Sequence, residues 1–381
     1  MSSRTVEYID TSATGGGDGT ESDPYDSLQE ALDTSSGPDG HGALVWLCKG
    51  SETLDSSGLD VSGVSWWSSP DMLIQGYGST VGDGGLYGIN MNGTSWPVGF
   101  NEGYSILKSL SVTNPGTTAT KFWSAYSRQS TLIDCHFSDF NTDTHVLSLD
   151  QPDNAVINCS FTDINARCIE GRIGVIDGCM FFNSGTREIT ECINTKPYTI
   201  TNCIFSLDGA TDGITGTSDA GRDIYNNSFY CASGGTGHAI RDYKGNRIHG
   251  NIIEGFAIGI QCDNLYTHTK QIVEANSFYN CTMNVGDGTT ASPANLTYGN
   301  WRIIGDSGGL GQANETLSNS PFAKSGSATS WSNRRAYFEP QDEGSVLGGA
   351  LNGNSRGAVQ LTSGGGGSST VVTPGPVQIG M

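Results

Sequence analysis

Leu132-Ile133-Asp134-Cys135-His136-Phe137 is the first copy of a six-residue signature, apolar-x-x-(Cys or Asn)-x-Phe, that occurs seven times in succession at steps of 20 to 25 residues. Its first column reads Leu132, Val156, Ile176, Ile200, Ile224, Ile248 and Val273. Its second column reads Cys135, Cys159, Cys179, Cys203, Asn227, Asn251 and Asn276. Its third column reads Phe137, Phe161, Phe181, Phe205, Phe229, Ile253 and Phe278. A repeat this regular predicts a solenoid.

A fourth apolar column runs between the copies, so each period holds at least two short strands. It reads Leu147, Ile169, Ile193, Ile214, Ile240 and Ile260. Short β runs separated by Gly, Asn, Asp and Ser, at a period in the low twenties, predict coils that stack as parallel strands about 4.8 Å apart. Like residues then stack on like, so we expect a core of Phe and Ile, a hydrogen-bonded ladder of Asn, and buried cysteines that pack as free thiols.

The two ends of the sequence resemble those of a known superfamily. Tyr8-Ile9-Asp10, Gly15 to Thr20 and Pro24 to Leu32 are similar to the N-terminal cap of the right-handed parallel β-helix superfamily typified by pectate lyases. Ser320 to Gly326 and Arg356 to Gln360 resemble the signatures that finish such β-helices in phage and other virus surface proteins. The resemblance covers most of the chain.

This resemblance implies an all-β, single-stranded, right-handed parallel β-helix of about ten or eleven coils. We predict a cap with a short helix in residues 1–42, in which Asp26 or Ser27 caps the helix and Leu28, Ala31 and Leu32 close the core. The β-helix follows in residues 43–305 and a C-terminal cap region in 306–362. A glycine-rich linker and an extended docking tail occupy residues 363–381.

Asp139 and Asp163 are the candidate catalytic pair, because each follows the column Phe by two residues. Stacked at about 4.8 Å, they meet the short separation of retaining glycosidases and could also bind Ca²⁺. Asn183 and Asn280 occupy the same slot, which favours a turn position instead. Asn141-Thr142-Asp143 and Gly40-His41-Gly42 match polygalacturonase motifs only in the wrong order, so we interpret them as chance matches.

A polar stripe follows the fourth apolar column and is the candidate carbohydrate-binding surface. One residue after that column lie Glu170, Asn194, Thr215, Arg241 and Gln261, and two residues further lie Arg172, Lys196, Thr217, Tyr243 and Asp263. These side chains suit sugar hydroxyls. Glu170 and Arg241 are three coils apart, roughly 14 Å, which is too far to act on one bond. A plain solvated surface is the alternative interpretation.

The aromatic and histidine residues give weaker evidence of a binding site. The aromatics before residue 130 are stacking platforms for sugars or packing residues under loops: Trp66, Trp67, Trp96, Phe100, Tyr104, Trp123 and Tyr126. The histidines show no metal-ligand spacing, so no structural zinc is expected, and no other cofactor is predicted.

Charge restricts the partners. The formal net charge of −20 would repel a phosphate backbone or an anionic membrane, so we predict neither nucleic acid binding nor membrane insertion. No apolar run approaches the ~20 residues of a membrane span, and residues 1–6 have no signal-peptide core.

Two functions from different classes fit these observations. The first is a structural or adhesive protein on the surface of a virion, made in the host cytoplasm, such as a capsid decoration, turret, fibre or tail spike. Its partners would be other virion proteins, copies of itself in a homo-oligomer such as a trimer, and a cell-surface glycan. The alternative is a polysaccharide lyase or glycoside hydrolase, secreted or on a cell surface. Fold alone does not choose between them.

Overall fold

The computed structural model describes most of the sequence up to residue 286 and short segments beyond it. The described residues are 4–34, 43–55, 71–94, 104–115, 121–125, 129–141, 145–183, 189–209, 211–216, 222–242, 247–262, 272–286, 315–324, 334–340 and 357. The chain divides into two compact units, unit 1 (Met1–Gly174) and unit 2 (Val175–Met381), which we describe separately. Among the described residues, no helix is long and apolar enough to cross a membrane.

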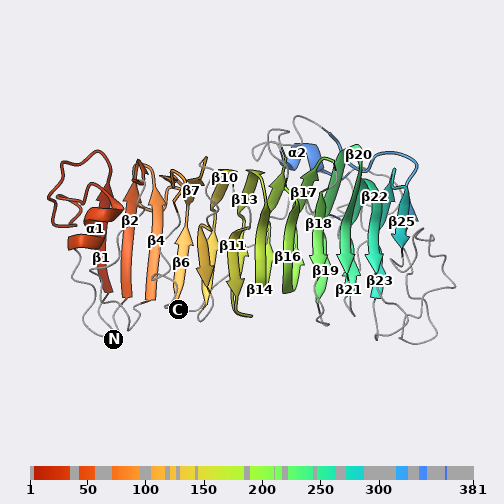
Figure 1. Cartoon of the computed structure of the whole chain (residues 1–381), viewed down its shortest axis with the longest axis horizontal. Helices are drawn as coiled ribbons and strands as arrows, with labels where there is room; N and C mark the ends of the chain where they lie inside the picture. The colour runs from red at the N-terminus through yellow and green to blue at the C-terminus, as the bar shows by residue number, and fades with distance from the viewer. Residues whose placement is uncertain are drawn as a thin grey trace, which may run out of the picture. The chain divides into compact units, whose positions relative to one another are not determined.

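Unit 1 is built from parallel strands that stack in register (Figure 1). One stack consists of β1 (Arg4–Asp10), β2 (Ala43–Lys49), β4 (Asp71–Tyr77), β6 (Ser105–Lys108), β9 (Ser130–Ile133) and β12 (Ala155–Ile157). A second consists of β3 (Ser51–Thr53), β5 (Tyr87–Asn90), β7 (Leu110–Thr113), β10 (His136–Phe140) and β13 (Ser160–Ile164). A third consists of β8 (Trp123–Ala125), β11 (His145–Asp150) and β14 (Arg167–Asp177), whose last residues belong to unit 2. Each successive coil therefore adds one strand to each stack. This arrangement is a right-handed parallel β-helix, as predicted.

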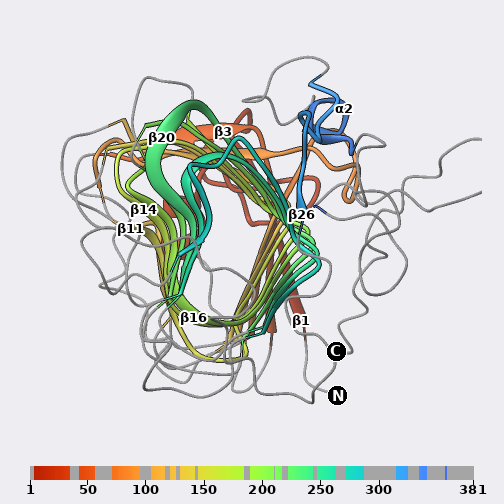
Figure 2. The same ribbon diagram turned by 90° about the vertical axis from the view of Figure 1, so that its right-hand side faces the viewer.

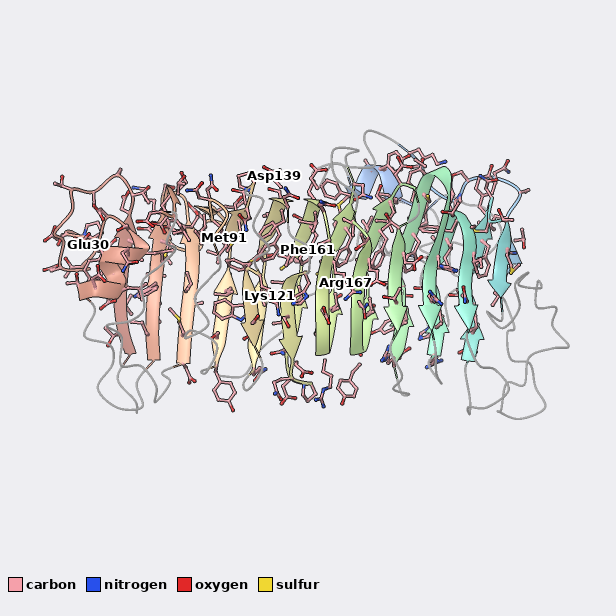
Figure 3. All side chains as sticks on the ribbon, viewed as in Figure 1. Glu30, Met91, Lys121, Asp139, Phe161 and Arg167 are labelled. Carbon is pink, nitrogen blue, oxygen red and sulfur yellow. The ribbon has the colours of Figure 1, made fainter. Side chains whose placement is uncertain are left out.

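The predicted capping helix is α1 (Leu28–Thr34), which lies beside β1 at the start of unit 1 (Figure 1). Its Leu28, Ala31 and Leu32 are buried. Ser27 caps the helix, because its Oγ accepts a hydrogen bond from the backbone N–H of Glu30 at 3.1 Å. The Glu30 carboxylate, labelled in Figure 3, accepts from the backbone N–H of Asp26 at 2.7 Å. This reciprocal arrangement is close to a capping box and fixes where the helix begins.

Unit 2 continues the same architecture. One stack follows the end of β16 (Glu191–Thr201) through β19 (Asp223–Tyr225), β21 (Arg247–His249) and β23 (Ile272–Glu274). A second consists of β15 (Met180–Phe182), β17 (Ile204–Leu207), β20 (Ser228–Asp242), β22 (Ile252–Cys262), β24 (Ser277–Tyr279) and β26 (Glu315–Thr316). The third joins β16 to β18 (Asp212–Gly216), β20, β22 and β25 (Met283–Gly286).

The phenylalanine column forms stacked rings in the interior of each unit. In unit 1, the Phe137 and Phe161 ring centroids are 5.1 Å apart and the planes differ by 19°. In unit 2, Phe205 lies between Phe181 at 4.9 Å and Phe229 at 4.4 Å, with planes 9° and 7° apart. All five side chains are completely buried. The ring spacing equals the strand spacing of a parallel sheet, so backbone pairing and aromatic stacking stabilise the same register.

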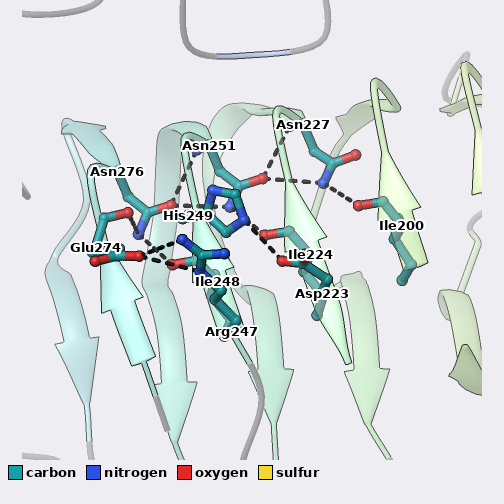
Figure 4. A network of polar contacts seen from close by, with 10 residues as sticks. All are labelled: Ile200, Asp223, Ile224, Asn227, Arg247, Ile248, His249, Asn251, Glu274 and Asn276. Atoms are coloured by element: carbon teal, nitrogen blue, oxygen red, sulfur yellow. Dashed lines mark hydrogen bonds and ion pairs between the residues drawn. The ribbon is translucent and has the colours of Figure 1, made fainter. Parts of the chain in front are cut away.

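The second column changes from thiols to amides along the chain. Cys135 and Cys159 in unit 1, and Cys179 and Cys203 in unit 2, are buried thiols that form no disulfide. In unit 2, the Oδ1 of Asn251 accepts from the backbone N–H and the Nδ2 of Asn227, at 2.9 and 3.0 Å (Figure 4). The Asn251 Nδ2 donates to Ile224 O at 3.1 Å and to Asn276 Oδ1 at 2.9 Å. This ladder satisfies polar groups at a turn that is completely buried.

A left-handed residue precedes each member of this second column, a feature that the sequence analysis did not identify. In the seven coils this residue has a φ between 52° and 65°, and it is Asp134, Asn158, Gly178, Asn202, Asn226, Gly250 or Ala275. Asp, Asn and Gly adopt this conformation at the lowest cost, so the turn explains why they dominate the slot. Side chains there also bond between coils: in unit 1 Asn158 Nδ2 donates to Asp134 Oδ1.

The described part of the C-terminal region packs on the outside of unit 2. Because Phe181 faces inward, the adjacent Met180 faces outward, and it joins a separate apolar cluster with residues from the C-terminal segment. The cluster consists of Met180, Phe182, Ile204, Ile252, Leu317, Phe322, Tyr337 and Phe338. α2 (Arg334–Phe338) lies outside the coil (Figure 2), whereas β26 pairs with β24 at the end of the second stack.

Polar contacts also hold the same C-terminal region to unit 2. Lys324 Nζ pairs with the buried Glu254 at 2.5 Å, and the backbone N–H of Gly357 donates to Gly250 O at 2.9 Å. The predicted tail and the rest of the second C-terminal signature lie outside the described residues.

Candidate functional site

The Asp139 and Asp163 pair occupies equivalent positions on β10 and β13, as predicted. Phe137 pairs with Phe161 in the same two strands. Both aspartates have a left-handed backbone, with φ of 59° and 53°, and so does Asn280 in unit 2, with φ of 52°. That shared conformation supports the turn interpretation of the slot, because Asp and Asn tolerate it best. Catalysis or Ca²⁺ binding by the pair stays a prediction.

Asn183, the fourth member of that slot, plays a different part in unit 2. Its Oδ1 accepts from the backbone N–H of Ile189 at 3.1 Å, and its side chain is buried. Within the described ranges, no group of three or more His, Cys, Asp or Glu side chains is arranged to hold a metal ion.

The predicted polar stripe is divided between the units. In unit 2, Asn194 on β16 pairs with Thr215 on β18, Thr215 with Arg241 on β20, and Arg241 with Gln261 on β22. Asn194 and Arg241 are half-buried, whereas Thr215 and Gln261 are buried. The side chain of Lys196 and residues Thr217, Tyr243 and Asp263 lie outside the part of the chain that the structure describes.

A second polar column lies three residues before this stripe, and the sequence analysis missed it. Glu191 on β16 pairs with Asp212 on β18. The Oδ1 of Asp212 accepts from the backbone N–H of His238 on β20 at 2.8 Å and lies 2.9 Å from its Nδ1. Glu191 also accepts from Asn194 Nδ2 at 2.6 Å, which joins the two columns. Together they form the polar face of unit 2, consisting of Glu191, Asp212, His238, Asn194, Thr215, Arg241 and Gln261.

Unit 1 carries a basic column on β8, β11 and β14. His145 pairs with Arg167, and the pairing of Leu147 with Trp123 places Lys121 opposite His145 on the other side. β11 lies between Lys121 and Arg167, and both are well away from Asp139 in Figure 3. Three basic side chains in register are unusual in so acidic a chain.

His145 is the member of this column with the least ordinary environment. It is only 7% exposed, and its Nδ1 lies 2.8 Å from Glu170 Oε2, which Arg167 also approaches at 3.6 Å. Burial lowers the pKa of His145, and Lys121 and Arg167 lower it further against the opposing effect of Glu170. The imidazole is therefore neutral at pH 7.

The hydrogen bonds of His145 assign its tautomer. A carboxylate can only accept, so Nδ1 carries the proton and Nε2 carries the lone pair. Among the described residues, this buried Nε2 has no hydrogen-bond partner. Such groups are rare in native proteins and are enriched at functional sites. Arg172, the other stripe residue of unit 1, pairs with Asp150 at 2.9 Å on the exposed surface.

The predicted aromatic platforms separate into two kinds. Trp123 is completely buried and its Nε1 donates to Ser130 Oγ at 3.1 Å, so it is a packing residue. Tyr104 is 52% exposed. The others, Trp66, Trp67, Trp96, Phe100 and Tyr126, lie outside the described residues.

Two histidines, the buried His145 and the partly buried His249, make stability depend on pH. Burial lowers the pKa of His249 despite its 2.8 Å contact with Asp223 (Figure 4), and it lowers the pKa of His145. As pH falls below about 6.5, the unfolded chain takes up these protons before the folded one does, so stability is lost. We expect His249→Gln to show a shallower loss of unfolding free energy between pH 7 and 5 than the unsubstituted chain in urea titrations. Parallel curves would contradict this assignment.

No protein-family model matches the sequence, and no curated protein is significantly similar to it. A search of solved structures finds a crystal structure of pectate lyase Pel9A with a TM-score of 0.47 and 11% identity, which covers 94% of this chain and 96% of that one. At that level the similarity says nothing about substrate or chemistry. The class that the fold itself defines is the right-handed parallel β-helix.

Proposed function

We propose that this chain is a structural and adhesive protein of a virion surface, and that its β-helix binds a host-surface glycan through the polar face of unit 2. The observation that carries the glycan-binding part is the in-register arrangement of Asn194, Thr215, Arg241 and Gln261 on four adjacent strands. Of these four, Thr215 and Gln261 are buried, so the half-buried Asn194 and Arg241, two strands or about 9.6 Å apart, are the groups that a saccharide would contact. The virion location rests on the C-terminal signatures of the sequence.

Glycan binding has a direct test in which one arginine of unit 2 is compared with another. Arg241→Ala is expected to weaken binding of the purified chain to immobilised host glycans by about tenfold, because a hydrogen bond to a charged group contributes roughly 1.5–3 kcal/mol. The matched control is Arg247→Ala, which removes an arginine that pairs with Glu274 at 3.0 Å on another stack. Equal loss in both variants, or no binding by the unsubstituted chain, would contradict the proposal.

A polysaccharide lyase or hydrolase is the second candidate, and His145 is the observation that favours it. A neutral imidazole oriented by Glu170, with its Nε2 lone pair free of partners among the described residues, has the properties of a general base. Incubation with acidic and neutral polysaccharides, with and without Ca²⁺, would settle the choice. Reducing ends or unsaturated products that disappear in His145→Gln, or in Asp139→Ala and Asp163→Ala, would establish the enzyme and overturn the non-catalytic proposal.

A further inference from the structure

The first stack of unit 1 has an apolar outer surface as well as an apolar inner one. Leu44, Trp46, Ile74, Leu107, Leu132 and Val156 face inward and are completely buried. Side chains alternate along a strand, so their neighbours face outward. We define the outer apolar face as Val6, Val45, Leu73 and Ile106 in one column, on β1, β2, β4 and β6, and Tyr8, Leu47, Ile133 and Ile157 in the next, on β1, β2, β9 and β12. Thr131 and Ala155 complete the first column on β9 and β12, and Gln75 and Lys108 separate Leu47 from Ile133 in the second.

Most of this face is accessible to solvent. Val6 is 46% exposed, and Val45, Leu73 and Ile106 are half-buried, as expected for side chains flanked by two neighbouring strands. Leu47 is the most covered member, at 7%. A contiguous apolar surface of this kind marks an interaction site more often than isolated exposed residues do.

The corresponding stack of unit 2 shows that the fold does not require such a surface. Its described outward positions on β19, β21 and β23 include Asp223, Arg247, His249 and Glu274, together with Tyr225, which stacks on His249. The first four form two pairs, His249 with Asp223 at 2.8 Å and Arg247 with Glu274 at 3.0 Å (Figure 4). One architecture therefore has charged pairs on the outer surface in unit 2 and aliphatic side chains in unit 1. The difference points to a partner for the outer apolar face of unit 1.

Charge indicates what kind of partner fits. Of the 381 residues, 39 are acidic and 19 are basic, yet the two columns of the face include one charged side chain, Lys108. At their edge, Asp10 and Lys49 pair at 2.8 Å. The sequence from Gly364 to Met381 contains no charged residue at all, and it includes Val371, Val372, Val377 and Ile379. An uncharged apolar segment and a nearly uncharged apolar face are complementary.

Dimensions favour a short segment over a second folded surface. Six strands about 4.8 Å apart extend about 24 Å, and two outward columns are roughly 7 Å wide. The area of a face with this length and width is far below the ~800 Å² per partner that a standard interface buries. Nine extended residues, 371–379, span about 30 Å, which is enough to cross the length of the face. Pro374 and Pro376 favour that extended conformation.

We propose that the outer apolar face of unit 1 binds residues 371–379 of a second copy of the chain. Gly357, the last described residue before this segment, is fixed to Gly250 in unit 2, whereas the face belongs to unit 1. A segment from a second copy reaches the face whatever the separation of the two units in one chain. Two copies that exchange their segments reciprocally close as a dimer, whereas donation in one direction builds rings or filaments. This inference is independent of glycan binding.

The test compares the full chain with a chain truncated after Thr362, which keeps every described residue. In sedimentation velocity runs at rising concentration, the full chain is expected to form oligomers and the truncated chain to remain monomeric. A labelled peptide of residues 368–381 is then titrated with the truncated chain and followed by fluorescence anisotropy. Leu73→Asp and Val6→Asp are expected to weaken peptide binding by at least about tenfold, because each places a charge in an apolar contact.

The matched control is Val175→Asp in unit 2, whose side chain is 38% exposed, and it should bind the peptide normally. Val6 lies on the terminal strand and is more exposed than Leu73, so its variant keeps the test informative if Leu73→Asp fails to fold. Three results would overturn the proposal: assembly that persists after truncation, peptide binding that is equal in Val6→Asp and the control, or a full chain that stays monomeric because its segment binds within its own chain.

Discussion

Asn251→Ala should lower the free energy of unfolding by about 3–5 kcal/mol, because one substitution removes four hydrogen bonds in a buried turn. The carboxamide accepts from the backbone N–H and the Nδ2 of Asn227, and it donates to Ile224 O and Asn276 Oδ1. Alanine leaves all four groups without these partners inside the coil, where water does not replace them. Denaturation in guanidinium chloride, followed by circular dichroism, measures the loss.

The same column provides a matched control for that prediction. Cys159 occupies the slot of Asn251 in unit 1 and is also completely buried, but its Sγ is a weak donor, with Ile157 O at 3.3 Å. Cys159→Ala is expected to cost only about 1 kcal/mol, mostly from lost packing. If the two variants were equally destabilised, the amide ladder would have no special role and volume alone would explain the column.

The repeat could be predicted from the sequence because stacking in register makes sequence spacing equal to position in space. Phe181, Phe205 and Phe229 have one chemistry, so their column is visible in the sequence alone. The left-handed turn column is less visible, since Asp134 and Ala275 share a backbone conformation and no side-chain chemistry. Spacing reveals columns of like side chains, whereas positions defined by φ need the structure.

The candidate site was only partly predictable for a related reason. The polar stripe was found because Asn194 and Arg241 follow a recognisable apolar column. His145 and Glu170 were not paired, because the contact is diagonal: Glu170 lies opposite Ser148, and His145 lies opposite Arg167. A column alignment compares residues in the same slot of successive coils. It does not show contacts between different slots, and the second polar column of unit 2 was missed in the same way.

The outer surfaces of the strands were the least predictable part of the fold. An alternating strand with apolar residues on both sides gives no sign of which side is the core. In unit 2, Met180 and Ile204 face outward and are covered by Phe322 and Phe338, which come from more than a hundred residues later. In unit 1, Leu73 and Ile106 face outward without a described cover of that kind. Local sequence cannot distinguish these cases, because the covering segment is distant in the chain.

Phe205→Asp should have the largest effect of any single substitution considered, and we expect unit 2 to lose its cooperative fold. The ring is completely buried between Phe181 and Phe229, so aspartate replaces two aromatic contacts with a carboxylate that lacks water and a cation. Loss of the ring alone costs about 3–5 kcal/mol, and an unpaired buried charge adds several more. Domains are stable by only about 5–15 kcal/mol, so little stability would remain.

The control for this substitution is Tyr198→Asp, which adds the same charge at a side chain that is 52% exposed. It should unfold within about 0.5 kcal/mol of the unsubstituted chain, as surface substitutions usually do. Because each coil of a solenoid contacts only its neighbours, disruption at Phe205 should also broaden or split the thermal transition, since coils beyond the lesion lose support on one side. A sharp, unshifted transition for Phe205→Asp would mean that the column register is wrong and that this side chain reaches solvent.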